Sequence, residues 1–241
     1  PANNWSTLLA KATTDYWATS TPNSNIEFTQ TMSCEMWVKF TTLTTDQALA
    51  SHAALYPGQI ADYKWLFQFF QNKKLRLICY HNDAAPAVSI WERFTNGGSN
   101  EPTGTWAHYG FTLDLGQAAL TDRCRFYKNG SYLGANTVTA GGSQLDLVDA
   151  SSIPLRVGGS ITSGNEFDGR IDEFRLWSDV RSDGEISTNY NTHIDATTAG
   201  LVAYYRFEEG SGTSVADQTS SNNDLGVGSG SPSFSGDTPF A

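Results

Sequence analysis

Clusters of basic residues and long apolar runs are both missing from this sequence. Its 241 residues include 15 Lys and Arg against 25 Asp and Glu, which gives a formal net charge of −10. Nucleic-acid phosphates require a basic patch or groove, so this composition excludes a nucleic-acid partner. No apolar run approaches the roughly 20 residues of a membrane-spanning helix, and we therefore expect no membrane span.

The first ten residues, PANNWSTLLA, lack the basic start and the continuous hydrophobic stretch of a signal peptide. Two interpretations remain open. Either an export signal has been removed, or the chain reaches the outside by another route, such as lysis that releases a virion component. In both cases we expect an extracellular location or one on a virion or cell surface.

Cysteine is scarce, and its number is odd. The three residues are Cys34, Cys79 and Cys124, each in an apolar, strand-like context. An odd number without short-range spacing does not make a disulfide framework. We expect three small buried hydrophobic residues, because free cysteine is among the most buried residue types; one disulfide plus a free thiol is the alternative.

Charged residues make up only 17% of the chain, whereas aromatic residues make up 12%. In residues 108–115, Tyr109, Phe111 and Leu113 alternate with more polar neighbours, and this period of two indicates a half-buried strand. Residues 35–40, 65–70 and 201–207 also have strand-like patterns. The pair Asn129-Gly130 favours a type I′ hairpin turn.

Only one convincing helix signal occurs, and it is short. Ser182 and Glu185 form a capping box ahead of Ile186 and Tyr190. Many short strands with turn signals and almost no helix predict an all-β sandwich or barrel. Composition is even along the chain, so we expect a single domain over residues 1–241, in which the Gly/Ser/Asn-rich segment 220–241 is coil or a docking tail.

Four segments resemble a known family. NEFDGRIDEFRLWSDVRSDGEI (residues 165–186) is similar to the signature F-x-G-x-I-D-E-V-R-I-W and its following short helix, and GLVAYYRFEEGSG (residues 200–212) is similar to GLVAYWxFDEGSG. TWAHYGFTL (105–113) and RFYKNG (125–130) match a further strand and a hairpin. Together these motifs resemble the laminin-G-like domains of the concanavalin-A-like lectin/glucanase superfamily. The resemblance implies a two-sheet antiparallel jelly-roll sandwich.

The resemblance also implies a calcium site. Laminin-G-like domains often hold one Ca²⁺, which takes six to eight oxygen ligands. Asp172, Glu208 and Asp217 lie in the family-like segments and are the expected metal ligands. The alternative is that these carboxylates are solvated or cap turns, since Asp hydrogen-bonds its own backbone readily.

Catalytic signatures are absent from the sequence. Some relatives on this fold hydrolyse β-glucans with an E-x-D-x-x-E strand, and no such motif occurs here. Asp172 and Glu173 are the nearest acidic pair, but adjacent strand residues point to opposite faces. No HExxH, G-x-S-x-G or P-loop motif is present either. We therefore expect that the protein is not an enzyme.

Aromatic residues outside the clear strand cores are candidates for sugar contact. Tyr56, Tyr63 and Trp91 are the expected ligand-binding residues, and Trp91 is followed directly by Glu92 and Arg93. A ring at the edge of the core is the alternative for each of them.

Two functions remain open at this stage. The first is a non-catalytic lectin-like module, stabilised by calcium, that binds carbohydrate or a cell surface. The alternative is a structural surface protein, such as a virion decoration, tail or surface-layer component, that assembles with other protein subunits.

Overall fold

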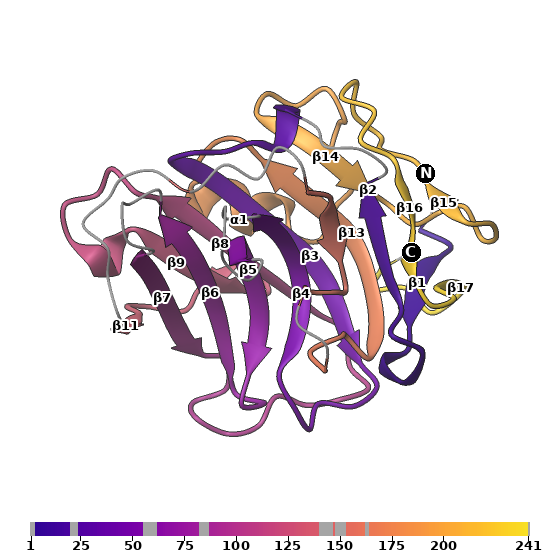
Figure 1. The fold of residues 1–241 in the computed structure, drawn as a ribbon, viewed down its shortest axis with the longest axis horizontal. Coiled ribbons are helices and arrows are strands. Elements are labelled where there is room, and N and C mark those ends of the chain that lie inside the picture. Colours follow the sequence, from indigo (N-terminus) through magenta and orange to yellow (C-terminus); the bar gives the residue numbers. More distant parts are fainter. Residues whose placement is uncertain are drawn as a thin grey trace.

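Alternating apolar residues build two antiparallel β-sheets that pack face to face. The computed structural model describes residues 3–19, 24–54, 62–81, 87–139, 147, 153–161 and 164–240. Within these residues, an eight-stranded sheet has the order β10–β9–β8–β3–β13–β1–β17, with β14 also paired to β13. A nine-stranded sheet has the order β11–β7–β6–β5–β4–β12–β2–β16–β15. In Figure 1, β5 to β7 pass in front of β8 and β9.

The strands of the eight-stranded sheet are β1 (Ser6–Leu9), β3 (Thr31–Phe40), β8 (Ala107–Asp114), β9 (Cys124–Lys128), β10 (Ser131–Tyr132), β13 (Gly169–Trp177), β14 (Leu201–Tyr205) and β17 (Ser233–Ser235). Those of the nine-stranded sheet are β2 (Tyr16–Thr19), β4 (Gln47–Ala54), β5 (Asp62–Phe70), β6 (Lys74–His81), β7 (Ala87–Phe94), β11 (Thr137–Thr139), β12 (Leu155–Val157), β15 (Ser214–Val215) and β16 (Leu225–Ser229). The helices are η1 (Lys11–Thr13), η2 (Ser24–Ile26), η3 (Leu120–Asp122) and α1 (Asp183–Asn189).

The predicted jelly-roll sandwich with one short helix is confirmed. Ser182 caps α1 by accepting a hydrogen bond from the Glu185 main-chain N–H, and the Glu185 side chain accepts one from Ser182, as the capping-box motif predicts. None of the helices in the described part of the chain is long and apolar enough to cross a membrane.

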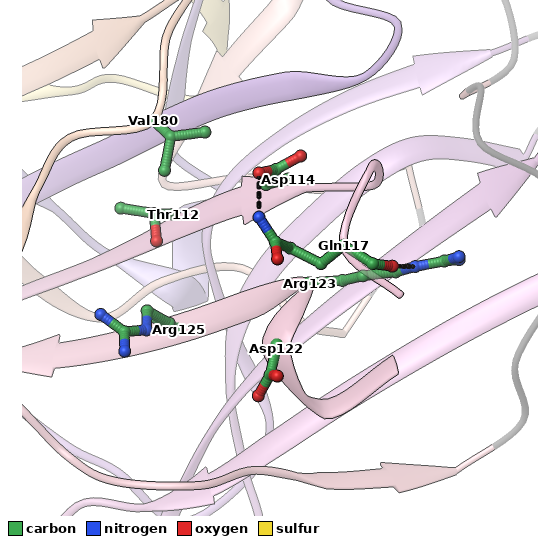
Figure 2. Close-up of a pocket in the computed structure, with 7 residues that line it drawn as sticks. All are labelled: Thr112, Asp114, Gln117, Asp122, Arg123, Arg125 and Val180. Atoms are coloured by element: carbon green, nitrogen blue, oxygen red, sulfur yellow. Dashed lines mark hydrogen bonds between the residues drawn. The ribbon is translucent and has the colours of Figure 1, made fainter. Parts of the chain in front are cut away.

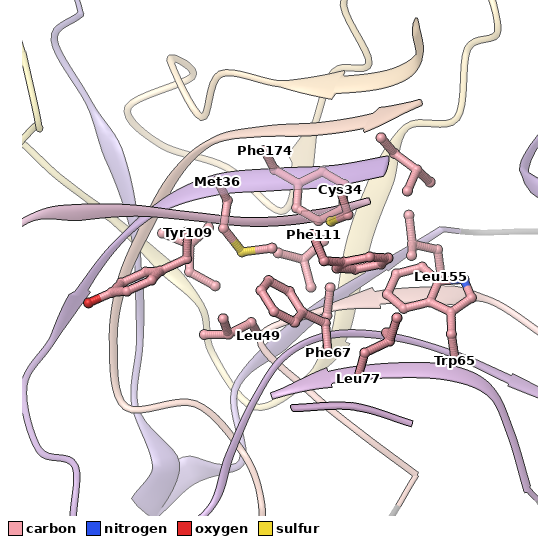
Figure 3. Close-up of a cluster of buried hydrophobic side chains, with 14 of the residues drawn as sticks. Cys34, Met36, Leu49, Trp65, Phe67, Leu77, Tyr109, Phe111, Leu155 and Phe174 are labelled. Atoms are coloured by element: carbon pink, nitrogen blue, oxygen red, sulfur yellow. The ribbon is translucent and has the colours of Figure 1, made fainter. Parts of the chain in front are cut away.

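The core lies between the two sheets. Inward-facing residues such as Met36, Phe67 and Phe111 are fully buried and belong to one hydrophobic cluster, part of which Figure 3 shows. The three cysteines are also buried, and all are free thiols, so the prediction of small buried hydrophobic residues is confirmed. Burial raises the pKa of the Cys79 thiol far above its usual range.

Segment 220–241 departs from the expected coil or tail. It contains β16, which pairs with β2, and β17, which pairs with β1. The Phe234 ring packs 5.8 Å from Trp17, centroid to centroid. Pairing with strands from the opposite end of the chain supplies the backbone hydrogen bonds, and it overrides the low strand propensity of Gly and Ser. That residues 1–241 form a single domain stays a prediction.

A β-bulge interrupts β13 at the Asp172-Glu173 pair. Glu173 has a φ of +50°, and the register with β3 shifts between Asp172 and Arg175. Ile171 and Phe174, three residues apart, therefore both reach the core. The strict alternation expected for Asp172 and Glu173 fails here, because a bulge adds one residue to the strand.

Candidate functional site

The three predicted calcium ligands are already hydrogen-bond acceptors within the protein. Asp172 accepts from the Asn3 side chain at 2.9 Å and from the Glu173 main-chain N–H at 2.8 Å. Glu208 accepts from the Asn4 main-chain N–H at 3.0 Å. Asp217 accepts main-chain hydrogen bonds from Tyr204, Thr219 and Asn223.

No group of three or more His, Cys, Asp or Glu side chains in the described ranges is arranged to hold a metal ion. Asp172, Glu208 and Asp217 thus do not fit a shared calcium ion. Their oxygen atoms fix the N-terminal arm and the turn after β15, as the turn-capping alternative predicts. Calcium binding by the chain stays a prediction without a ligand set.

Asp172 is instead a source of pH-dependent stability. Its side chain is completely buried, and this burial, together with the charge of Glu173, raises its pKa well above the usual value. The stabilisation that depends on protonated Asp172 is fully present at pH values below about 3.9, the pKa of an Asp side chain in the unfolded chain. It is lost as the pH rises through the raised native pKa.

We expect Asp172→Asn to stabilise the protein at pH 8 but not near pH 3. The amide cannot ionise, and once the Asn3 amide turns over, its NH₂ group can donate to the Asn3 Oδ1, which in the native protein is buried without a hydrogen-bond partner. The melting temperature at pH 8 should rise on the order of 2–4 °C, the shift that about 1 kcal/mol produces in a domain of this size. Thermal unfolding at both pH values measures it; a lower melting temperature for the variant at pH 8 would contradict it.

Trp91, the leading sugar-contact prediction, points into the core. Its side chain is completely buried, and its indole N–H donates to the Leu120 carbonyl oxygen at 2.8 Å. It therefore cannot stack on a sugar, and the alternative of a core ring is correct. Tyr56 lies outside the described residues, and only the backbone of Tyr63, in β5, is described.

Asp172 and Glu173 do not form a hydrolytic pair. Both are buried, with at most 1% of either residue exposed, so no glycosidic bond can reach them. The Glu173 carboxylate is instead surrounded by partners: Arg175 at 3.0 Å, His193 at 3.0 Å, Arg206 at 3.4 Å and the Tyr204 hydroxyl. These contacts tie β13 to β14 and to the segment after α1.

A polar pocket lies where β8 ends and β9 begins, on the outer side of the eight-stranded sheet. Its volume is about 350 Å³. Figure 2 shows the residues that line it, which come from β8, the β8–β9 connection, β9 and the segment between β13 and α1: Thr112, Asp114, Gln117, Asp122, Arg123, Arg125 and Val180.

Local hydrogen bonds shape the connection between β8 and β9. Asp114 accepts from the Gly116 main-chain N–H at 3.0 Å and from the Gln117 side chain at 2.6 Å. Arg123 Nε donates to the Gln117 carbonyl oxygen at 2.9 Å. The loop therefore holds Gln117 against the end of β8, and η3 presents the exposed Asp122 to the pocket.

The pocket combines balanced charge with apolar surface. Two arginines and two aspartates line it, so the lining has no net charge. The Arg125 guanidinium pairs with Asp183 at 2.7 Å and lies 4.5 Å from the Tyr132 ring centroid. Val180, which lines the pocket, is 39% exposed. The site thus offers hydrogen-bond donors, acceptors and apolar contacts within a small volume.

Sequence reasoning missed this pocket although it predicted both flanking strands. Thr112 and Asp114 fall in the predicted strand 108–115, and Arg125 begins the hairpin motif RFYKNG. The only sequence feature that points to the pocket is the expected antiparallel pairing of these two neighbouring strands. The connection between such strands lies beside their ends.

Comparison with known proteins identifies the fold. A laminin-G-like family model, described as "Concanavalin A-like lectin/glucanases superfamily", matches residues 11–187. No curated protein sequence shows a significant match.

Solved structures with a similar fold include three with TM-scores above 0.5. A protein of Bacteroides ovatus ATCC 8483, provisionally named a carbohydrate binding protein, aligns with a TM-score of 0.67 at 14% identity. That alignment covers 100% of this chain and 62% of the other, so this chain spans less than two thirds of that protein. A heptameric SAP-like pentraxin from Limulus polyphemus has a TM-score of 0.52 at 10% identity, and the alignment covers 93% of this chain and 95% of the pentraxin chain.

The third is the CBM40 domain of the Ruminococcus gnavus IT-sialidase bound to α2,3 sialyllactose. It has a TM-score of 0.52 at 10% identity, and the alignment covers 79% of this chain and 100% of the domain. At such identities the three likenesses show a shared sandwich fold, and function must be argued from the site.

Proposed function

This chain belongs to the concanavalin A-like lectin/glucanases superfamily, and from that premise we propose that it is a non-catalytic carbohydrate-binding module. The observation that carries the proposal is the polar pocket between β8 and β9. Binding modules among its structural neighbours, such as the sialyllactose-bound domain, support the choice of ligand class. Such a module acts outside the cell or on a surface.

The pocket chemistry suits a sugar. Ligand pockets commonly have volumes of roughly 300–1,000 Å³, and this one, at about 350 Å³, lies near the lower end, where one or two sugar residues fit. Asp122 accepts hydrogen bonds from hydroxyl groups, and Arg125 and Gln117 donate to them. Val180 provides apolar surface for the C–H groups of the ring.

The same geometry supports binding rather than hydrolysis. Hydrolysis of a glycoside requires two carboxylates that act on one bond, one of them as a general acid. In the pocket, Asp114 is committed to the Gly116 N–H and to Gln117, which makes it a structural support for the loop. Asp122 alone remains as an exposed carboxylate.

We expect Asp122→Asn to weaken glycan binding at least tenfold. A hydrogen bond to a charged group is worth about 1.5–3 kcal/mol, and 1.4 kcal/mol corresponds to tenfold in affinity. A glycan array with the native protein identifies the ligand, and calorimetry with that glycan measures the loss.

Asp195→Asn is the matched control, because Asp195 is an exposed aspartate outside the pocket whose carboxylate binds Thr197. The affinity of the Asp195→Asn variant for the selected glycan should equal that of the native protein. The proposal fails if the native protein binds no glycan, or if Asp122→Asn binds the selected glycan as tightly as the control does.

A further inference from the structure

Two charged side chains of the polar pocket are open to a ligand. Asp122 is exposed, and the Arg125 side chain is 44% exposed; both line the pocket (Figure 2). Arg123, the other arginine of the lining, is only 7% exposed, and its Nε donates to the Gln117 carbonyl oxygen. Arg125 is therefore the cation that a ligand in this pocket meets first.

A carboxylate of the protein itself already binds Arg125. The Arg125 Nη1 donates to Asp183 Oδ1 at 2.7 Å, and the Tyr127 hydroxyl donates to the same oxygen atom at 2.7 Å. Asp183 is the first residue of α1 and directly follows the N-cap residue Ser182, so the backbone also fixes its position. Arg125 thus has an internal anion beside it.

This tethered anion disfavours a second carboxylate at Arg125. Exposed ion pairs are weak, so the carboxylate of a ligand gains little by replacing one. Asp183 competes with that carboxylate at an effective concentration on the order of millimolar, because Asp183 and Arg125 belong to one chain. A carboxylate-bearing sugar must therefore be present at a higher concentration than a sugar that needs no such exchange.

The surrounding charge acts in the same direction. Asp114 and Asp122 line the pocket together with two arginines, and Asp183 adds a third aspartate beside them. Three anions and two cations leave one negative charge at the site, and the whole protein carries a net charge of −10. Such a field lowers the local concentration of anionic ligands.

A neutral sugar meets no such barrier. The bond to Asp183 engages Nη1, and an arginine has further N–H donors that a sugar hydroxyl can reach at Arg125. Asp122 can accept a hydrogen bond from a neighbouring hydroxyl. Because each hydroxyl both donates and accepts, the two side chains can hold a neutral ring without displacing Asp183.

We propose that the pocket selects neutral sugars against carboxylate-bearing sugars of the same shape, and that Asp183 sets this selectivity by pairing with Arg125. This inference rests on the proposed function. It adds the class of sugar, and it assigns the choice to a residue that stands behind the pocket lining rather than in it.

A glycan array that carries neutral and acidic partners side by side tests the proposal. Suitable pairs are galactose with galacturonic acid, glucose with glucuronic acid, and lactose with α2,3 sialyllactose. The native protein should bind the neutral member of a pair more tightly than the acidic member. Calorimetry at low and high salt should give the same affinity for the neutral member, because screening acts on charged ligands.

Asp183→Asn tests the role of the tethered anion. The amide keeps an oxygen acceptor for Arg125 and Tyr127 but carries no charge, so the ratio of neutral to acidic affinity should fall about fivefold, the upper end of what an exposed ion pair contributes. Asp195→Asn is the matched control, because it removes the same charge outside the pocket; it should keep the native ratio. A native-like melting curve shows that Asp183→Asn is folded, as the 51% exposure of the Asp183 side chain predicts.

The outcomes separate this inference from the proposed function. A native protein that prefers the acidic members overturns the selectivity but still supports glycan binding. The same holds if Asp183→Asn keeps the native ratio, or if Asp195→Asn changes the ratio as much. Binding to no glycan at all overturns both the proposed function and the selectivity.

Discussion

Replacing Glu173 with alanine is expected to lower the free energy of unfolding by about 3–5 kcal/mol, the usual cost of removing one partner of a buried ion pair. Arg175 is only 1% exposed, and it faces Glu173 at 3.0 Å and Glu35 at 3.6 Å. Without the Glu173 carboxylate, the guanidinium keeps only the longer of these contacts, and the Tyr204 hydroxyl loses its acceptor. Urea unfolding of both proteins measures the difference.

Glu35 alone cannot compensate for that loss. Burial would raise its pKa, but contact with His108 and the charge of Arg175 lower it to about 2, so its carboxylate already serves two buried groups. The loss in Glu173→Ala is a large share of the 5–15 kcal/mol that stabilises a typical domain.

Arg125→Ala is the matched control, because it breaks an ion pair with Asp183 whose side chains are 44% and 51% exposed. Exposed pairs contribute about 0–1 kcal/mol, so this variant should unfold close to the native midpoint. Equal losses in the two variants would show that the buried network is worth no more than a surface pair.

The bulge at Glu173 shows where sequence reasoning reaches its limit. Period-two patterns located β3, β8 and β14, because hydrophobic alternation directly reflects which face is buried. The bulge produces no such hydrophobic pattern in the sequence. It depends on Glu173 adopting a positive φ and on Arg175 and Tyr204 lying beside the Glu173 carboxylate. These partners come together only through tertiary packing.

The sugar-contact prediction failed for a related reason. The sequence singled out Trp91 in what became β7, but Trp91 is completely buried while Phe94, three residues later, is exposed. An error of one or three residues along a strand moves a side chain to the other face. Which face of β7 meets the core depends on β6 and β11, and the local pattern does not define it. The pocket could not be predicted from the sequence either, because residues far apart in the chain, such as Gln117 and Val180, line it together only in the folded structure.

We expect Phe111→Ala to lower the free energy of unfolding by about 3–5 kcal/mol, the cost of a large cavity in a core. Phe111 is completely buried at the centre of β8. Its ring lies 5.0 Å from that of Phe67 and 6.1 Å from that of Trp65, both on the opposite sheet, and Figure 3 shows the three together between the sheets. Truncation removes edge-to-face contacts as well as buried area.

The same substitution tests how the core supports the pocket. Thr112 and Asp114 extend from β8 to the pocket lining, so a cavity beneath the strand loosens their support without touching any pocket atom. Phe94→Ala is the matched control, since it truncates the same residue type on the solvent side of β7 and should change stability by less than about 0.5 kcal/mol. The midpoints of urea denaturation, compared at constant m-value, measure the stability difference between Phe111→Ala and Phe94→Ala. A loss below about 1 kcal/mol in Phe111→Ala would mean that the core collapses into the cavity, and that the two sheets are not held together at this ring.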